Sequence, residues 1–333
     1  MFHLWHASDM PVLDNHLEET MEQTAAVKDY VISPLGEALG AEVTGLDLSK
    51  PLSGSVIGEL KRAIAQYGVL CFRDQTLSEA QQIEFSKQWG PLEDFPEEDK
   101  TVAAATVYHV ANVSADGQSL PETDFRVIYQ KVNARWHTDS SYRYVPAYVS
   151  LLYGIEVMPK GAPGGRTGFS NMIAAYAALP EALKDEIEPL HMVHTYEFGR
   201  RLFPELPPVS KHEKESVPPV SQPLVRVHPD RGNQRSLYFT ANAGNEISGL
   251  TLEEGQALHR KLVEHISQPQ FTYFHEWKKG DLVVWDNRTM LHKAEAYDMS
   301  KYRRVFRRTT VAGDGPVLGP YSRAVVGNRR GAT

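Results

Sequence analysis

Cysteine, long apolar runs and excess positive charge are all scarce or absent in this sequence of 333 residues. Cys71 is the only cysteine, so an internal disulfide and a thiolate metal cluster are excluded, and a reducing cytoplasm suits the chain. No stretch approaches the roughly 18 to 20 consecutive apolar residues that span a bilayer. Lys and Arg number 35 against 42 Asp and Glu, a net charge of -7, which argues against nucleic acid and anionic membranes as partners.

The start of the chain also lacks basic residues. Residues 1–26 carry several acidic side chains but no Lys or Arg, which is the opposite of a secretory signal. They show no apolar periodicity, so we expect an N-terminal arm over 1–26. Composition is otherwise typical of a soluble globular protein, with 41% hydrophobic and 23% charged residues. We therefore expect a single domain over 27–315, a C-terminal tail over 316–333, and a cytoplasmic location.

Hydrophobic periodicity divides the front quarter of the chain between helices and strands. Apolar residues recur at helical spacing before Gly68, a natural C-cap, and Thr76 and Glu79 have the spacing of a capping box. In order, these patterns predict a hairpin within 27–48, a helix over 56–67, a strand over 69–72 and a helix that Gly90 ends.

From Trp136 onward, β patterns dominate, so the sequence predicts a mainly β fold with flanking helices. The predicted strands are 148–157, 224–227, 236–240, 271–277, 281–285 and 303–311, and helices are expected at 180–188 and from Thr251. Two irregular connections, 91–135 and 196–229, have no clean period. Long connections of this kind often cover an active site, so we expect both to act as lids.

Two His-x-Asp tripeptides are candidate metal ligands, His137-Thr138-Asp139 and His228-Pro229-Asp230. In extended chain this spacing puts both side chains on one face. Turn residues follow His228 and favour a hairpin there, so the first tripeptide is preferred. His292, just after an apolar strand, is the best third ligand, because two His and one carboxylate form the facial triad of non-haem Fe(II). A buried, hydrogen-bonded histidine remains the alternative at each position.

Four arginines lie in the predicted strand 303–311. Alternation places Arg304 and Arg308 on one face and Arg303 and Arg307 on the other. The pair that faces inward needs an anionic partner, because burying guanidinium without one is costly. The pair that faces outward is expected to form a solvated basic edge. Together with a metal that has open positions, the inward pair suggests a small dicarboxylate held against iron.

These motifs match a known family. The matching segments are Leu39–Leu48, Trp136–Asp139, Gly164–Thr167, and Trp285 through His292 to Val311. From about Leu39 to Gly313 the sequence resembles the taurine dioxygenase and aryloxyalkanoate dioxygenase family of Fe(II)/2-oxoglutarate-dependent oxygenases. The resemblance implies a double-stranded β-helix, a cupin-like jelly roll of two packed sheets. It also implies that His137, Asp139 and His292 bind Fe(II), with 2-oxoglutarate and O2 as cosubstrates.

The resemblance further implies roles for side chains around the metal. Thr167 and Arg304 would bind the far carboxylate of 2-oxoglutarate, and Arg308 would lie near both the cosubstrate and an anionic substrate. Asn133 matches an asparagine that lies near the substrate in the taurine enzymes. Phe95 stands where those enzymes carry a sulfonate-binding histidine. This difference favours a small anionic substrate with an apolar body, such as an aryloxyalkanoate, over taurine.

Three alternative hypotheses stay open at this point. The first alternative, within the same class of enzyme, is a taurine-type sulfonate dioxygenase. A zinc hydrolase could use the same His, Asp and His, with zinc lowering the pKa of a bound water, but it has no use for Thr167 and the inward arginines. A non-catalytic jelly-roll binding protein would keep these residues as scaffold only. The expected partner is a small molecule, and the sequence leaves homo-oligomer formation open.

Overall fold

The structure, a computed structural model, describes residues 29–94, 106–114 and 116–322. Several sequence predictions therefore lie wholly or partly outside the described residues: the arm over 1–26, part of the segment 91–135 together with Phe95, and the end of the tail over 316–333. In the part of the chain that is described, no helix is both long and apolar enough to cross a membrane.

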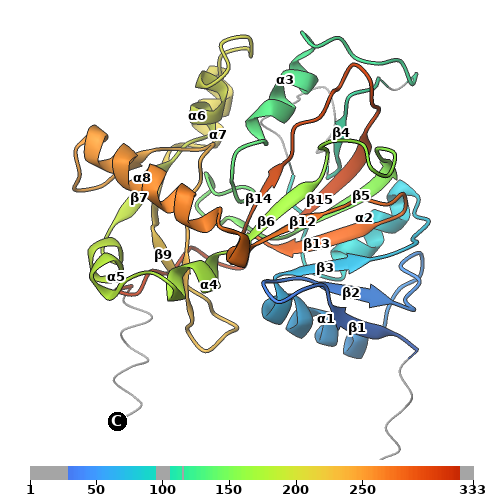
Figure 1. The fold of residues 1–333 in the computed structure, drawn as a ribbon, viewed down its shortest axis with the longest axis horizontal. Helices are drawn as coiled ribbons and strands as arrows, with labels where there is room; N and C mark the ends of the chain where they lie inside the picture. The colour runs from blue at the N-terminus through green and yellow to red at the C-terminus, as the bar shows by residue number, and fades with distance from the viewer. Residues whose placement is uncertain (1–28, 95–105, 115, 323–333) are drawn as a thin grey trace, which may run out of the picture.

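Two packed sheets form the centre of the molecule (Figure 1). The larger sheet has the order β1 (Val31–Pro34), β2 (Ala41–Thr44), β3 (Val69–Phe72), β13 (Leu282–Asp286), β5 (Ala147–Glu156), β15 (Val305–Ala312) and β4 (Tyr108–Ala111). Its pairs are antiparallel apart from β2 and β3, which run parallel. The smaller sheet has the order β12 (Thr272–His275), β6 (Thr167–Asn171) and β14 (Met290–Ala294). Antiparallel sheets packed in this way are typical of a jelly roll.

Strand β13 shows why the two sheets stay together. All five of its residues are buried, as expected for a central strand covered on both faces. Val283 and Trp285 pack with Phe169 of β6 in a core that both sheets share. The alternate residues, Leu282 and Val284, point to the other face, where they pack against helix α1 (Gly54–Tyr67).

Two helices cover the outer face of the larger sheet. Helix α1 ends at Gly68, which has a φ of 74° and caps the helix as predicted. The predicted capping box of Thr76 and Glu79 is wrong by two residues. Ser78 caps α2 (Glu79–Lys87), because its hydroxyl accepts from the backbone of Gln81 while the Gln81 side chain accepts from the backbone of Ser78.

A second core lies beside the smaller sheet, where α4 (Met172–Ala177), α5 (Glu181–Ile187) and α8 (Leu252–Ile266) pack together. Figure 1 shows these helices on the side of the molecule away from α1 and α2. The predicted capping box of Thr251 is observed, with Glu254 as its partner. A 3-10 turn, Pro269–Phe271, joins α8 to β12.

The two predicted lid segments hold more regular structure than their patterns indicate. Segment 91–135 contains β4 and α3 (Phe125–Val132), and β4 pairs with β15 at the edge of the larger sheet. Segment 196–229 contains α6 (Tyr196–Arg201), α7 (Lys211–Ser216), β8 (Val220–Pro223) and β9 (Val225–Val227).

Two small sheets complete the fold. In one of them, β7 (His191–His194) lies between β8 and β11 (Glu246–Ile247), and in the other β9 pairs with β10 (Arg235–Leu237). The β9–β10 pair is the hairpin predicted around His228.

Candidate metal centre and cosubstrate site

A pair of backbone hydrogen bonds brings His137 and His292 together. The N–H of His137 donates to the carbonyl of His292 at 2.9 Å, and the reverse bond is 2.7 Å. His292 lies on β14, whereas His137 lies in an isolated bridge outside the named strands. The two imidazole centroids are 4.1 Å apart. Nδ1 of His137 bonds to the carbonyl of Arg135 at 2.8 Å, which turns its Nε2 toward His292 and Asp139.

Two side chains hold the carboxylate of Asp139 beside these rings, and a third holds its backbone. Its Oδ2 lies 3.7 Å from Nε2 of His292 and accepts from the hydroxyl of Ser150 at 2.6 Å. Its Oδ1 accepts from Nη1 of Arg308 at 2.8 Å. Oδ1 of Asn287 accepts the backbone N–H of Asp139 at 3.2 Å. The carboxylate is therefore fixed from β5 and from β15, and the backbone of Asp139 from the turn before β14.

The protonation states expected at this cluster suit a divalent cation. Burial alone would raise the pKa of Asp139, but the charge of the Arg308 guanidinium and the hydrogen bond from Ser150 help to lower it to about 2. Burial lowers the pKa of both His137 and His292. One ligand atom from each of the three residues lies within 4.8 Å of the others. An ionised carboxylate and two neutral imidazoles at this separation fit Fe(II), with coordination positions left for other ligands.

Cavities adjoin the cluster. His137 and Asp139 border a small pocket together with Asn133, Arg308 and the side chains of Tyr108, Tyr129, Tyr142 and Asn242. Asn133 also lines a neighbouring cavity of about 440 Å³, and Arg304 lies in the wall of that cavity. Arg304 in turn borders a groove of about 670 Å³ with Phe306 and Trp277. Of the predicted substrate and cosubstrate residues, Asn133 and Arg308 thus line the pocket at His137 and Asp139, and Arg304 lines the two larger cavities.

Arg304 is a buried cation whose charge lacks a carboxylate partner in the described part of the chain. Its side chain is only 4% exposed, and its guanidinium lies over the ring of Phe306 at 4.1 Å. Burial lowers the pKa of Arg304 to about 10. Since isolated buried charge is costly, this arginine is suited to an anion that arrives from solution.

The other two arginines of the motif do not reach these cavities. Arg303 is exposed and pairs with Glu156 at 2.9 Å, as predicted for an outward residue. The expectation of a solvated side chain is wrong for Arg307, which is 9% exposed and donates to the carbonyl of Leu77 at 2.6 Å. The reason is that β15 lies inside the sheet and α2 covers its outer face.

Thr167 lies at the start of β6 and is buried, paired across the sheet with His275 and Ala294. Its Oγ1 accepts the indole N–H of Trp277 at 3.0 Å. Its backbone neighbour Ala294 lines the 440 Å³ cavity that Arg304 borders. Asn133 caps the end of α3, and its carbonyl accepts from the N–H of Ala294 at 2.8 Å.

The second His-x-Asp tripeptide is structural, as its turn residues predict. His228 is fully buried with Nε2 at 3.5 Å from Oδ2 of Asp286, and Asp230 pairs with Arg288 at 2.6 Å. Arg288 also pairs with Asp286 at 2.8 Å. These contacts hold the turn that precedes β14 and leave no role for His228 at the His-Asp-His cluster.

Sequence reasoning missed the side chains that orient Asp139. Ser150 and Asn287 are both buried and are linked by a hydrogen bond of 2.9 Å from the Asn287 amide to the Ser150 hydroxyl. A serine inside the otherwise apolar strand 148–157 was a usable signal, because a buried hydroxyl needs a partner. The tyrosines of the pocket carried no such signal, since aromatic residues are common in any core.

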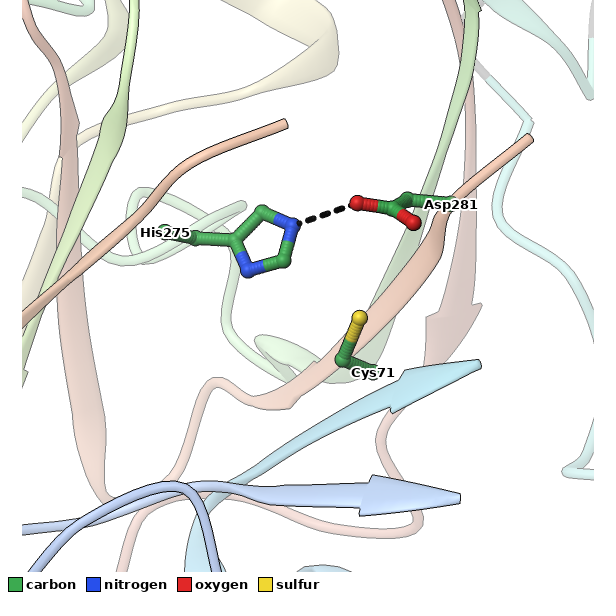
Figure 2. A group of neighbouring side chains, drawn as sticks. All are labelled: Cys71, His275 and Asp281. Carbon is green, nitrogen blue, oxygen red and sulfur yellow. Dashed lines mark hydrogen bonds and ion pairs between the residues drawn. The ribbon is translucent and has the colours of Figure 1, made fainter. Parts of the chain in front are cut away.

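A second buried cluster contains metal-binding residue types, as Figure 2 shows: Cys71, His275 and Asp281, with ligand atoms within 4.8 Å of one another. Here, however, Oδ2 of Asp281 accepts from Arg73 at 2.7 Å, from the backbone of Lys278 at 2.9 Å and from Nε2 of His275 at 3.0 Å. Burial, followed by the charge of Asp281, raises the pKa of the Cys71 thiol, which therefore keeps its proton. This cluster is a hydrogen-bonded network that already includes a cation.

The comparison with known proteins agrees with this geometry. Residues 32–310 match the model of the taurine catabolism dioxygenase TauD, TfdA family. The chain belongs to this family. It is 36% identical over 291 residues to an alpha-ketoglutarate-dependent 2,4-dichlorophenoxyacetate dioxygenase of Cupriavidus pinatubonensis, covering 86% of this chain and 99% of the relative. It is 35% identical to an (S)-phenoxypropionate/alpha-ketoglutarate-dioxygenase of Sphingobium herbicidovorans, over 86% of this chain and 96% of that protein.

A solved structure shows the same fold. AAD-2 in complex with Mn(II) and N-oxalylglycine has a TM-score of 0.76 at 38% identity, covering 87% of this chain and 98% of that chain. The predicted double-stranded β-helix and the predicted family are thus confirmed. So is the predicted class, an Fe(II)- and 2-oxoglutarate-dependent dioxygenase, given the family, these relatives and the buried His-Asp-His cluster. The zinc-hydrolase and non-catalytic hypotheses are wrong.

Proposed function

We propose that this dioxygenase hydroxylates a small carboxylate, with aryloxyalkanoates as the substrate class. The side chains described above bind the metal, the cosubstrate and the substrate in separate groups. The observation that carries the proposal is Arg304, a buried cation without a carboxylate partner among the described residues, in the wall of the cavity that Asn133 also lines. When bound there, Fe(II) and 2-oxoglutarate supply the activation of O2 that converts a substrate C–H bond to C–OH.

His137, Asp139 and His292 hold the iron in this proposal. Nδ1 of His137 is engaged by the Arg135 carbonyl, so Nε2 is the ligand atom. Asp139 keeps one oxygen for Arg308 and turns the other toward His292. The bonds to both oxygens hold the carboxylate in place before the metal arrives, which reduces the cost of ordering the site.

Arg304 and Thr167 take the far carboxylate of 2-oxoglutarate. A guanidinium fork can bind a carboxylate through two parallel hydrogen bonds, which fixes its position as well as its charge. Because Arg304 is held over Phe306, the cosubstrate meets a cation that is already oriented. The hydroxyl of Thr167 adds one further hydrogen bond to the same carboxylate.

Arg308 and Asn133 hold the anionic end of the substrate in the pocket next to the metal. Arg308 lies over the ring of Tyr108 at 5.2 Å, and the same pocket is lined by Tyr129 and Tyr142. Rings suit an aryl group on the substrate, and Phe95, outside the described residues, is proposed to contact this apolar body. The relatives named for 2,4-dichlorophenoxyacetate and (S)-phenoxypropionate support this class.

Position decides the outcome of the reaction. If Arg308 places the carbon between the carboxylate and the ether oxygen nearest the metal, that carbon is the one hydroxylated. A carbon bearing both a hydroxyl and an aryl ether is a hemiacetal, which breaks down to a phenol and a carbonyl compound. Segments 91–135 and 196–229 are proposed to close over the pocket and exclude water. A cytoplasmic location and assembly into a homo-oligomer stay predictions.

A substrate panel tests the proposal. Release of succinate is compared for an aryloxyacetate, an aryloxypropionate, taurine and a simple aliphatic acid under identical Fe(II) and 2-oxoglutarate. We expect the aryloxy acids to give the fastest turnover and Arg308→Ala to remove most of it. A clear preference for taurine supports the sulfonate alternative, and a neutral substrate that survives Arg308→Ala rejects the assigned role of Arg308.

A further inference from the structure

We propose that Trp277 is a positioning residue for the cosubstrate, because its indole supports both side chains that receive the far carboxylate. This inference rests on the proposed function of Thr167 and Arg304. Trp277 follows β12 and borders the 670 Å³ groove together with Arg304 and Phe306. The predicted alternation over 271–277 marked this tryptophan only as part of a strand.

The first support is a hydrogen bond whose direction is fixed. An indole N–H can only donate, so Oγ1 of Thr167 must be the acceptor in the bond of 3.0 Å from Trp277. One lone pair of the hydroxyl is thereby occupied, which restricts the rotation of the hydroxyl group about its C–O bond. The hydroxyl hydrogen of Thr167 remains available for a different partner, and a carboxylate oxygen is the acceptor that the proposed function supplies.

The second support runs through Phe306. The rings of Trp277 and Phe306 meet edge to face, with centroids 4.7 Å apart and an interplanar angle of 76°. The guanidinium of Arg304 lies over the same phenylalanine ring at 4.1 Å. One indole therefore touches Thr167 directly and holds the ring on which Arg304 rests. A shift of Trp277 moves both carboxylate-binding groups together.

The indole is itself held by the network in Figure 2. The ring of His275 packs against Trp277 at 4.7 Å with an interplanar angle of 85°. Nε2 of His275 lies 3.0 Å from Oδ2 of Asp281, and its Nδ1 lies 2.9 Å from the hydroxyl of Tyr273. The dashed line in Figure 2 marks the first of these contacts. Because both ring nitrogens are engaged, His275 cannot rotate freely. The buried His275–Asp281 pair thus holds the imidazole ring that packs against Trp277 and limits the movement of the indole. This gives the network a role at the active site.

The test is Trp277→Phe, which keeps an aromatic ring and removes the N–H. The affinity for 2-oxoglutarate is measured by anaerobic titration of the Fe(II) enzyme, following its visible charge-transfer band, and KM values for 2-oxoglutarate and substrate are measured in turnover. We expect the dissociation constant and KM for 2-oxoglutarate to rise about fivefold, the scale of one hydrogen bond. The KM for the substrate and kcat should stay within about twofold.

Coupling to Thr167 separates positioning from general loosening. In a Thr167→Ala background, Trp277→Phe should have almost no further effect on 2-oxoglutarate affinity, since the acceptor is already gone. Trp89→Phe is the matched control, because this buried indole packs on Phe85 and its N–H has no partner among the described residues. That control should leave 2-oxoglutarate affinity unchanged.

Phe306→Leu provides a second variant, independent of Trp277, and should raise the 2-oxoglutarate requirement through Arg304. The inference is overturned if Trp277→Phe and Phe306→Leu both bind 2-oxoglutarate like wild type, if the effects of Trp277→Phe and Thr167→Ala simply add, or if substrate KM rises as much as cosubstrate KM. If Trp277→Phe does not fold, the Phe306→Leu titration decides. Failure of the wild-type enzyme to bind 2-oxoglutarate would instead overturn the proposed function.

Discussion

His137 and Asp139 border a cavity, whereas Cys71, His275 and Asp281 border none of the cavities described above. In the first cluster, Nε2 of His292 lies 3.7 Å from Oδ2 of Asp139, too far for a hydrogen bond and far enough to share an ion. In the second, the corresponding distance between His275 and Asp281 is 3.0 Å, so a proton bridges the two groups. Similar residue types therefore have different roles, metal binding in the first cluster and hydrogen bonding in the second, and their neighbours determine the role.

The same contrast holds for two buried arginines. Arg288 pairs with Asp286 at 2.8 Å and with Asp230 at 2.6 Å, so its charge is neutralised inside the protein. Arg304 is buried to a similar degree, at 4% exposure against 7% for Arg288, and has no carboxylate partner among the described residues. A buried arginine that is paired with carboxylates stabilises the fold, whereas a buried arginine without such a partner is suited to bind an anionic ligand.

The largest expected effect separates the two clusters by metal binding. His292→Ala should lower Fe(II) affinity and succinate formation by at least about a hundredfold, because a lost ligand costs more than the ten- to hundredfold typical of a residue behind the ligands. His275→Gln in the other cluster should leave Fe(II) affinity near wild type. Calorimetric titration with Fe(II) under nitrogen measures both. Loss of iron from His275→Gln with retention in His292→Ala would reverse the assignment.

The next effect concerns the unpaired arginine. Arg304→Lys keeps the charge but loses the two-pronged contact, so KM for 2-oxoglutarate should rise about ten- to a hundredfold, equivalent to ~1.5 to 3 kcal/mol. Arg303→Lys is the matched control, one residue away and exposed in a pair with Glu156, and should have little effect. If Arg303→Lys raises the KM for 2-oxoglutarate more than Arg304→Lys does, then Arg303 rather than Arg304 binds the far carboxylate.

Removing the anion of the second cluster should affect stability and spare iron binding. Asp281→Asn leaves Arg73 paired only with the more exposed Glu42 and weakens the bond to His275, which should lower the free energy of unfolding by about 1 to 3 kcal/mol. Urea unfolding measures the loss, and Fe(II) titration of the folded variant should match wild type. Asp47→Asn, in an exposed pair with Lys50, is expected to change stability little. Equal losses in the two variants would contradict a structural role specific to Asp281.

A pH dependence near the metal centre provides the last comparison. Burial raises the pKa of Glu93 to about 7, against the opposing hydrogen bond from Ser140. A carboxyl group with a raised pKa in the folded state contributes stability that is complete below its unfolded pKa near 4.5 and is lost as pH rises through 7. The amide of the Glu93→Gln variant does not ionise, so the variant does not lose this stability. Its free energy of unfolding should therefore rise by up to ~3 kcal/mol relative to wild type between pH 4.5 and pH 8. Urea unfolding at several pH values measures this gain, and parallel profiles for the two proteins would refute it.

Local patterns predicted the features that depend on residues close in the chain. The helix before Gly68, the buried strand after it and the hairpin around His228 all follow from spacing, caps and turn residues. The preference for the tripeptide at His137 over the one at His228 is local in the same sense, because turn chemistry alone marks the second as a hairpin. Where two caps compete within four residues, as at Thr76 and Ser78, the pattern places the helix start only to within a turn.

Features that depend on packing between distant segments could not be derived in this way. The burial of Arg307 requires that β15 lie inside a sheet and under α2, and nothing within the strand says which neighbours it will have. Ser150 and Asn287 meet Asp139 only because β5, β13 and the turn before β14 converge. Side-chain partners separated by more than a hundred residues are set by the register of whole strands.

The sequence by itself determined the fold class, the family and the identity of the ligand types, because apolar periodicity, turn residues and a His-x-Asp motif are short-range features. Only the tertiary structure decided which His and Asp residues share space for an ion and which share a proton. It also decided that Arg304 is buried with no carboxylate partner among the described residues, and that Trp277 packs on the Phe306 ring over which Arg304 lies. The physical reason is that charge and hydrogen-bond satisfaction are properties of an environment assembled from several strands, and a single segment carries only its own donors and acceptors.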